Sequence, residues 1–266
     1  MLRQPATLSV AGATLALVLA QYFGPWTQWP DQDLVAFSTE FDEDLALGAY
    51  CSGLFPMPLH HSGFEGEMGW WSPMQRGILP LDGLRVSRSL RKTARRYTTT
   101  VNACFTTVLQ RCGDDSRPDG WIDDDIVRVY TELHERGAAH SVETWDEQGR
   151  LVGGLYGVAI RGLFAGESMF HDDELGRDAS KVALMRLVTT LAEEDHGRLL
   201  DVQWRTEHLA SLGVVEVDRT TYLGLLELAL DDLPMDWTRV SGRAPMDAAT
   251  LLAQVDQLSR REDDDA

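Results

Sequence analysis

The pattern of apolar and polar positions between residues 138 and 213 predicts three consecutive strands. Apolar and polar residues alternate from His140 to Trp145, and an apolar run from Leu151 to Ile160 follows the intervening turn. This is the pattern of a β-hairpin. A third strand is expected from Leu163 to Phe170, because the Arg161-Gly162 pair interrupts the apolar run before it.

A helix and a fourth strand complete this unit. Apolar residues recur at helical spacing between Ser180 and Glu194, and Gly197 supplies a C-terminal cap. Residues 199–204 then predict another strand. Three strands, a helix and a strand therefore predict one compact unit.

The rest of the chain predicts mainly helices. Asp123 or Asp124 can cap a helix that closes at Gly137, and a basic helix is expected from Ser89 before a run of threonines. Further helices are expected at 42–50, 102–112, 220–230 and 247–261, with a strand at 77–81. The polar stretch 113–120 contains proline and glycine, so it predicts a domain boundary or an exposed loop.

Acidic and amide side chains interrupt the apolar strands. Glu167 lies within the third strand, whereas Asp201 and Gln203 lie two residues apart in the fourth and so share a face. A carboxylate on a half-buried strand costs free energy unless a partner or a ligand compensates it. These residues indicate either a functional site or a structural ion pair with Arg198 or Arg205.

Charge is distributed unevenly along the chain. The 266 residues are 44% hydrophobic and 25% charged, which is typical of a soluble globular protein, and the net charge is -18. The segment 76–96 is nevertheless basic, and Asp82 is its single acidic residue. The chain ends in the acidic run Glu262 to Asp265. The cations are Arg76, Arg85, Arg88, Arg91, Lys92, Arg95 and Arg96. Such a segment indicates either a phosphate-binding patch or a solvated surface.

The remaining composition argues against metal and disulfide chemistry. Cys51, Cys104 and Cys112 fit no zinc-ligand spacing, so we expect reduced thiols in a cytoplasmic protein. The apolar run from Leu8 to Ala20 is too short to span a bilayer. It can mimic a signal peptide, but we favour a helix packed on the domain because nothing downstream indicates export.

A series of short motifs carries a family resemblance. They include Gly53-Leu54-Phe55-Pro56, Trp70-Trp71-Ser72-Pro73, Ser87-Arg88-Ser89, Gly120-Trp121-Ile122, His140-Ser141-Val142-Glu143, Gly166-Glu167-Ser168-Met169-Phe170, Ala179-Ser180-Lys181 and Asp201-Val202-Gln203. In this order they resemble the leucyl/phenylalanyl-tRNA-protein transferases, over roughly residues 30 to 237.

The resemblance implies an α+β fold. A small N-terminal domain would precede an acetyltransferase-like (GNAT-type) domain, whose mixed, mostly antiparallel sheet is flanked by helices. The expected divisions are 1–28 for a helical extension, 29–112 for the N-terminal domain with its basic tRNA-contact segment, 113–237 for the catalytic domain, and 238–266 for a C-terminal helix and acidic tail.

The resemblance also implies an activity. Members of the family move leucine or phenylalanine, and less readily methionine, from aminoacyl-tRNA to proteins that begin with arginine or lysine, which marks those proteins for degradation through the N-degron pathway. The donor is an activated ester, so neither metal nor cofactor is expected. We expect a cytoplasmic monomer without membrane contacts.

Residue roles follow from the matched positions. The resemblance implies catalytic roles for Glu167, Asp201 and Gln203, with Gln203 orienting the attacking amine and Asp201 behind it. It implies a side-chain pocket of Leu155, Phe164, Met169 and Phe170, terminal-adenosine contacts from Tyr50, Trp121 and Tyr130, and tRNA-backbone contacts from Arg91, Lys92, Arg95 and Arg96. For the aromatic residues the alternative is core packing.

The chain departs from the family pattern at several positions. Met57 replaces an aromatic residue, Thr206 and Glu207 replace Asn and Asp, and Val35 to Ser38 replace a glycine-rich block. Two alternatives to the transferase stay open. One is a coenzyme A acetyltransferase of the same fold, which the missing pyrophosphate loop before Ser180 disfavours. The other is a tRNA- or degron-binding protein without turnover.

Overall fold

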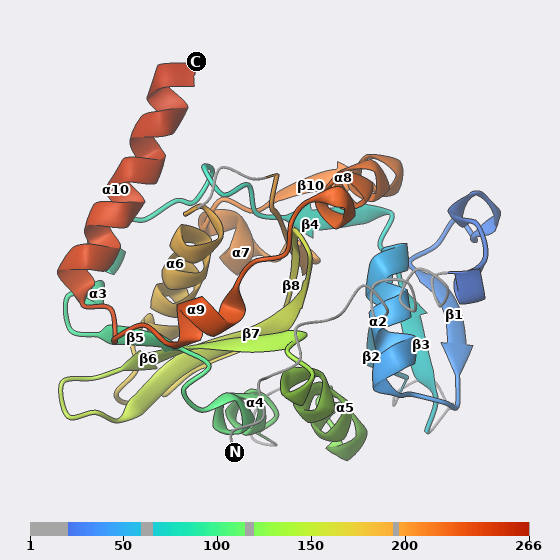
Figure 1. The fold of residues 1–266 in the computed structure, drawn as a ribbon, viewed down its shortest axis with the longest axis horizontal. Helices are drawn as coiled ribbons and strands as arrows, with labels where there is room; N and C mark the ends of the chain where they lie inside the picture. The colour runs from blue at the N-terminus through green and yellow to red at the C-terminus, as the bar shows by residue number, and fades with distance from the viewer. Residues whose placement is uncertain (1–20, 60–65, 115–119, 194–196, 266) are drawn as a thin grey trace.

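The strands of the chain form two sheets (Figure 1). The computed structural model describes residues 21–59, 66–114, 120–193 and 197–265. The smaller sheet has the order β1-β3-β2, with β1 at Leu34–Ser38, β2 at Phe55–Pro58 and β3 at Met68–Trp71, all antiparallel. None of these three strands was predicted from the sequence. Their apolar patterns are too short to distinguish from loop.

The larger sheet has seven strands in the order β10-β4-β9-β8-β7-β6-β5. They are β4 (Gln75–Ile78), β5 (Thr98–Val101), β6 (Ala139–Trp145), β7 (Leu151–Ile160), β8 (Leu163–His171), β9 (Leu199–Gln203) and β10 (Val215–Asp218). Among the described strands only β8 and β9 pair in parallel, across the connecting helix α6 (Ala179–Leu191). The mixed, mostly antiparallel sheet is therefore confirmed, and β7, β8 and β9 match the predicted strands within one residue.

Helices cover both faces of this sheet (Figure 1). The helices of the described residues are α2 (Glu43–Ser52), α3 (Arg88–Ala94), α4 (Phe105–Cys112), α5 (Asp124–Glu135), α6, α7 (Glu207–Ser211), α8 (Arg219–Asp231), α9 (Trp237–Ser241) and α10 (Ala248–Asp265), preceded by the 3-10 turns η1 (Gln21–Phe23) and η2 (Trp26–Gln28). Of these, α2 lies beside the small sheet (Figure 1). Of the two candidate caps, Asp123 is the one that accepts the Ile126 backbone N–H, at 2.9 Å. The capping side chain satisfies a donor that the first turn leaves free.

Two apolar cores lie on the two faces of the large sheet. Tyr156 and Val158 of β7 point into a core shared with α2, α4, α5 and α8. Leu155 and Ala159 point into the other core, shared with α3, α6, α9 and α10. Because both faces are covered, β7 reads as a continuous apolar run rather than as an alternation.

The large sheet crosses the expected boundary between residues 112 and 113. β4 and β5 come from the segment 29–112, yet β4 pairs with β9 and β10, and β5 pairs with β6. The small sheet is made of residues 34–71 alone. The predicted C-terminal helix is confirmed as α10. The apolar run from Leu8 to Ala20 lies outside the described residues, and within the described ranges no helix is long and apolar enough to cross a bilayer.

Gly153 lets α6 start close against β7, which yields a test of this packing. A Cβ at Gly153 would lie 2.5 Å from the Ala179 Cβ, whereas a Cβ at Gly224 on α8 would meet nothing within 4 Å. We expect Gly153→Ala to lower the free energy of unfolding by ~1–3 kcal/mol. Gly224→Ala, the matched control, should raise it by up to ~1 kcal/mol. Urea denaturation measures both, and equal stability of the two variants would contradict the packing.

Candidate active site

The parallel strands β8 and β9 separate toward their C-terminal ends. They pair only from Leu163↔Leu199 to Ala165↔Asp201, although β8 runs on to His171 and β9 to Gln203. Glu167 and Gln203 lie on the two sides of this split. The Gln203 Nε2 is 3.5 Å from Glu167 Oε1, and the Gln203 backbone N–H donates to Asp201 Oδ1 at 2.9 Å. The structure thus brings the three polar strand residues together.

A β-bulge directs the Glu167 side chain. On β7, Tyr156 pairs with Ser168 and Gly157 pairs with Gly166, so Glu167 is the extra residue on β8. A bulge breaks the alternation of side chains along a strand. As a result Glu167 faces Tyr130 of α5, whereas Met169 packs on the opposite face with the α6 core.

Two tyrosines hold the Glu167 carboxyl. The Tyr130 hydroxyl donates to Glu167 Oε2 at 3.1 Å, and the Tyr50 and Tyr130 hydroxyls lie 2.5 Å apart. Burial raises the pKa of Glu167 to about 8, and the tyrosine hydrogen bonds oppose this only in part. Burial also raises the pKa of both tyrosines, so both remain protonated donors. The result is a carboxyl group that titrates near neutral pH.

These two tyrosines do not offer a stacking surface. Tyr50 is 1% exposed and Tyr130 is 0% exposed, so neither ring has a free face for an adenine. The resemblance implied adenosine contacts here. In the structure α2 and α5 bury both rings, and the Tyr130 hydroxyl donates to Glu167. Trp121, just before α5, is half-buried.

Asp201 is part of a buried ion pair. Arg76 of β4 donates from Nε to Asp201 Oδ1 at 2.9 Å and from Nη2 to Oδ2 at 2.6 Å. The ion-pair interpretation was therefore correct, but the expected partners were wrong: Arg198 donates to backbone carbonyls, and Arg205 is exposed. In the sequence Arg76 is one of the cations of the basic segment. Its pairing with Asp201 could not be predicted, because the two residues lie 125 positions apart.

Gln203 ends β9 in a left-handed backbone conformation, with φ of 59°. A residue other than glycine pays about 1–3 kcal/mol for strained backbone of this kind, and the hydrogen bond to Asp201 offsets part of it. Next in the chain, Trp204 packs edge-on against Phe55 and Trp71, with ring centroids 4.9 and 5.9 Å apart. These aromatic neighbours of the site were not predicted as part of it.

The four residues expected to form an apolar pocket divide between the two faces of the sheet. Leu155 and Phe164 are buried in the core next to α6, and Met169 packs against the same core. Phe170 lies in the other core, with the Arg111 guanidinium 5.0 Å from the centre of its ring. The strand alternation after the bulge separates Phe170 from the other three.

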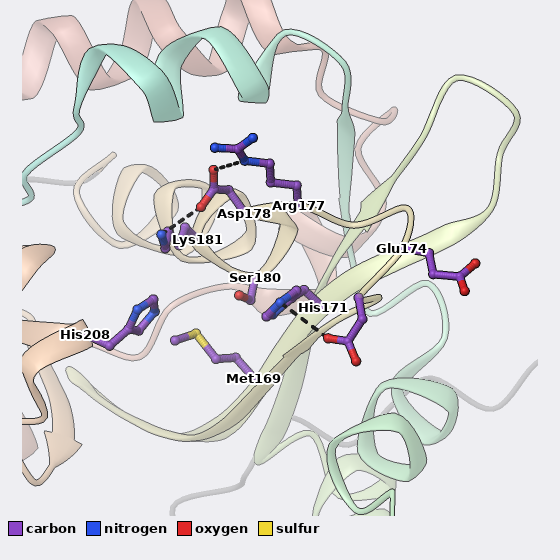
Figure 2. Close-up of a pocket in the computed structure, with 9 residues that line it drawn as sticks. Met169, His171, Glu174, Arg177, Asp178, Ser180, Lys181 and His208 are labelled. Atoms are coloured by element: carbon purple, nitrogen blue, oxygen red, sulfur yellow. Dashed lines mark hydrogen bonds and ion pairs between the residues drawn. The ribbon is translucent and has the colours of Figure 1, made fainter. Parts of the chain in front are cut away.

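An open cavity of about 630 Å³ adjoins Met169 (Figure 2). Polar residues from the end of β8, the loop that follows it, the start of α6 and α7 supply the rest of its lining, including Ser180 and His208. Within it, Lys181 Nζ lies 2.7 Å from Asp178 Oδ1. Because Glu167 and Met169 face opposite sides of the sheet, a substrate that touches both has to pass between β8 and β9.

The expected tRNA contacts lie on and just after α3. Lys92, Arg95 and Arg96 are exposed, whereas Arg91 forms an ion pair of 2.6 Å with Asp256 of α10. Thr206, one of the departures from the family pattern, caps α7 by accepting the Leu209 backbone N–H at 3.2 Å. This substitution therefore retains a local structural function.

The fold and the site together define a candidate enzyme with acid–base chemistry, because a carboxyl group whose pKa is raised to about 8 lies beside an amide at an opening in the sheet. The model of the family Leucyl/phenylalanyl-tRNA protein transferase matches residues 78–227. The chain belongs to this family.

Individual relatives agree with this assignment. A leucyl/phenylalanyl-tRNA–protein transferase of Rhizorhabdus wittichii is 49% identical over 193 residues, covering 71% of this chain and 75% of the relative. That of Afipia carboxidovorans is 42% identical over 222 residues, covering 82% and 94%. Among solved structures, L-PGS from Bacillus licheniformis aligns with a TM-score of 0.36 and 12% identity over 64% of this chain and 65% of that chain, which is too weak to define the fold.

The raised pKa of Glu167 predicts how stability depends on pH. A carboxyl whose folded pKa is raised stabilises the fold fully below its ordinary value of 4.5, and that contribution is lost as the pH rises toward about 8. Relative to Glu167→Gln, which cannot titrate, the wild type should lose at most about 1.4 kcal/mol per pH unit in this range. Denaturant unfolding at pH 5, 6.5 and 8 measures the difference. A difference that does not change with pH would contradict the shifted pKa.

Proposed function

We propose that this chain transfers leucine or phenylalanine, and less readily methionine, from aminoacyl-tRNA to the N-terminal arginine or lysine of acceptor proteins. Family membership supports the reaction class. The observation that carries the proposal for the site is the half-buried Glu167 carboxyl, which lies beside Gln203 at the split between β8 and β9. Proteins modified in this way are marked for degradation.

The chemistry requires an oriented amine and a proton acceptor. The acceptor's α-amino nitrogen forms a bond to the ester carbonyl carbon, and the bond from that carbon to the ribose oxygen breaks. We assign the amine proton to the Glu167 carboxylate, which returns it to the departing ribose hydroxyl. The Gln203 side-chain amide is a very weak base, so its role is to orient the amine.

The donor would occupy both sides of the split. Its amino-acid side chain would lie on the α6 face with Leu155, Phe164 and Met169, where a flexible methionine can adapt to leucine or phenylalanine. The terminal adenosine would lie on the other face, near Trp121. Lys92, Arg95 and Arg96 would contact the tRNA backbone without reading sequence.

We also propose that the large sheet has the acetyltransferase-like arrangement. The parallel pairing of β8 and β9 through α6, and its early end, support this. The domain division that suits the sheets is a small N-terminal unit around residues 34–71 and a catalytic unit that begins at β4.

Transfer of labelled phenylalanine or leucine from charged tRNA onto peptides tests the function. We expect transfer to peptides beginning with arginine or lysine, and none to peptides beginning with glutamate. Glu167→Gln should lower kcat by about 100-fold or more, the usual contribution of a general base, with unchanged tRNA affinity. Glu135→Gln, which alters an exposed carboxylate on α5, is the matched control.

Other outcomes of this assay separate the alternatives. Retained tRNA affinity without any transfer by the wild type would select a tRNA- or degron-binding protein. Measurable coenzyme A binding would select an acetyltransferase, although the loop before α6 carries Asp172, Asp173 and Glu174, which disfavour a pyrophosphate.

The exposed cations on and after α3 predict a salt dependence. Replacing Lys92, Arg95 and Arg96 by glutamine should weaken tRNA binding and make the slope of log K against log salt shallower by about one for each phosphate left without its cation, about three in all. Arg150→Gln, in the hairpin between β6 and β7, should leave the slope unchanged. Fluorescence titrations at several salt concentrations measure it. An unchanged slope in the triple variant would assign the tRNA surface elsewhere.

A further inference from the structure

Arg76 of β4 is a buried cation with partners on three other parts of the chain. Its side chain is 1% exposed, and its guanidinium lies between the rings of Phe55 and Tyr222, 4.8 and 4.4 Å from their centroids. Two of its nitrogens donate to Asp201, and Nη1 donates to the carbonyl of Gly53 at 3.2 Å. The planar guanidinium thereby fixes the position and the plane of the carboxylate, as a bidentate pair does.

The Asp201 carboxylate has no acceptor position left for a substrate. Oδ1 accepts from Arg76 Nε and from the Gln203 backbone N–H, both at 2.9 Å. Oδ2 accepts from Arg76 Nη2 at 2.6 Å and from the Tyr222 hydroxyl at 2.9 Å. A carboxylate offers about four acceptor positions, and Asp201 is 0% exposed. It therefore neither contacts an incoming amine nor receives its proton.

Asp201 instead fixes the backbone of Gln203, whose N–H it accepts. The left-handed conformation at Gln203, φ 59°, turns the chain at the end of β9. This turn leaves the Gln203 side chain facing Glu167 across the split, with Nε2 3.5 Å from Oε1. Contacts therefore run without a gap from Arg76 through Asp201 to the amide that faces the site.

We propose that Arg76 is a positioning residue for aminoacyl transfer: together with Tyr222 it locks Asp201, and Asp201 in turn sets the orientation of Gln203. The inference rests on the proposed function. It assigns Asp201 to positioning, and it leaves Glu167 as the proton acceptor at this site. Arg76 acts through two intervening residues and touches no reacting atom.

The test uses the full chain with phenylalanyl-tRNA and an arginine-initiated peptide. Arg76→Ala should lower kcat about 100-fold, the size of effect that a misplaced group causes, with KM for the peptide and tRNA affinity within twofold of the wild type. Millimolar guanidinium should restore at least a tenth of the lost kcat by filling the vacated space. Arg219→Ala is the matched control: Arg219 is also buried and donates to the carbonyls of Pro30 and Gln32, but it does not contact Asp201. Its kcat per folded molecule should equal that of the wild type, with or without guanidinium.

Tyr222→Phe covers the case in which Arg76→Ala does not fold. It keeps the ring and removes one donor from Asp201, so we expect kcat to fall about tenfold at an unchanged peptide KM. Wild-type kcat in this variant would overturn the proposal. A folded Arg76→Ala variant that keeps the wild-type kcat would also overturn the proposal. The same holds if guanidinium restores the stability of this variant but not its kcat.

A second measurement separates this inference from the proposed function. The Gln203 side-chain amide resonance in ¹⁵N-labelled protein should shift in Arg76→Ala and return with guanidinium, independently of any transfer. If the wild type transfers nothing, the proposed function fails, and this resonance alone decides whether Arg76 positions Gln203. A resonance that stays unchanged in Arg76→Ala would overturn the inference even in an active enzyme.

Discussion

The buried ion pair between Arg76 and Asp201 joins parts of the chain that the sequence keeps far apart. It connects β4, the first strand of the large sheet in the sequence, to β9. The Tyr222 hydroxyl of α8 and the Gly53 carbonyl after α2 complete its hydrogen bonds. Removing one member of such a pair typically costs about 3–5 kcal/mol, because the other charge stays buried, whereas replacing both by apolar groups is often neutral. The pair is therefore explained better by the geometry it imposes than by the stability it adds.

A second constraint is the separation of β8 and β9. Parallel strands that pair over only three positions leave backbone and side chains open beyond the last pair, and here a carboxyl and an amide face each other across that opening. The bulge at Glu167 adds to this arrangement, because it points Glu167 to one face of the sheet and leaves Met169 on the other. One strand can thus contribute both to proton transfer and to an apolar side-chain pocket.

The cations of the basic segment have different surroundings in the folded chain. A chain of net charge -18 repels nucleic acid as a whole, so the proposed binding of tRNA requires a local cluster of cations, for which we propose Lys92, Arg95 and Arg96. The nearby α10 places Asp256 against Arg91, so one cation of the segment is already engaged by the chain itself. Arg76, although it belongs to the same basic segment of the sequence, is the buried cation of the site instead.

The sequence alone determined the elements with long or regular patterns. β7 and α6 follow from apolar patterns, and α5 follows from its periodicity and its Asp123 cap, because these signals depend on residues close together in the chain. The expected cap of α6 at Gly197 was wrong, because the helix ends at Leu191 and Ala192 is its C-cap. The short strands β1, β2, β3, β5 and β10 were not predicted, since four or five residues carry too little pattern. The motif order was sufficient to indicate the family, and the alternation along β9 correctly placed Asp201 and Gln203 on one side.

Tertiary structure decided which groups meet. Arg76 reaches Asp201 across 125 residues, and Tyr130 reaches Glu167 across 37; no local pattern specifies contacts at such separations. The bulge at Glu167 and the left-handed Gln203 depend on the register with neighbouring strands, so residue spacing did not indicate the face of the sheet on which Phe170 lies. Residue spacing determines the face of a helix or strand from which a side chain projects. Tertiary packing determines which groups that side chain contacts.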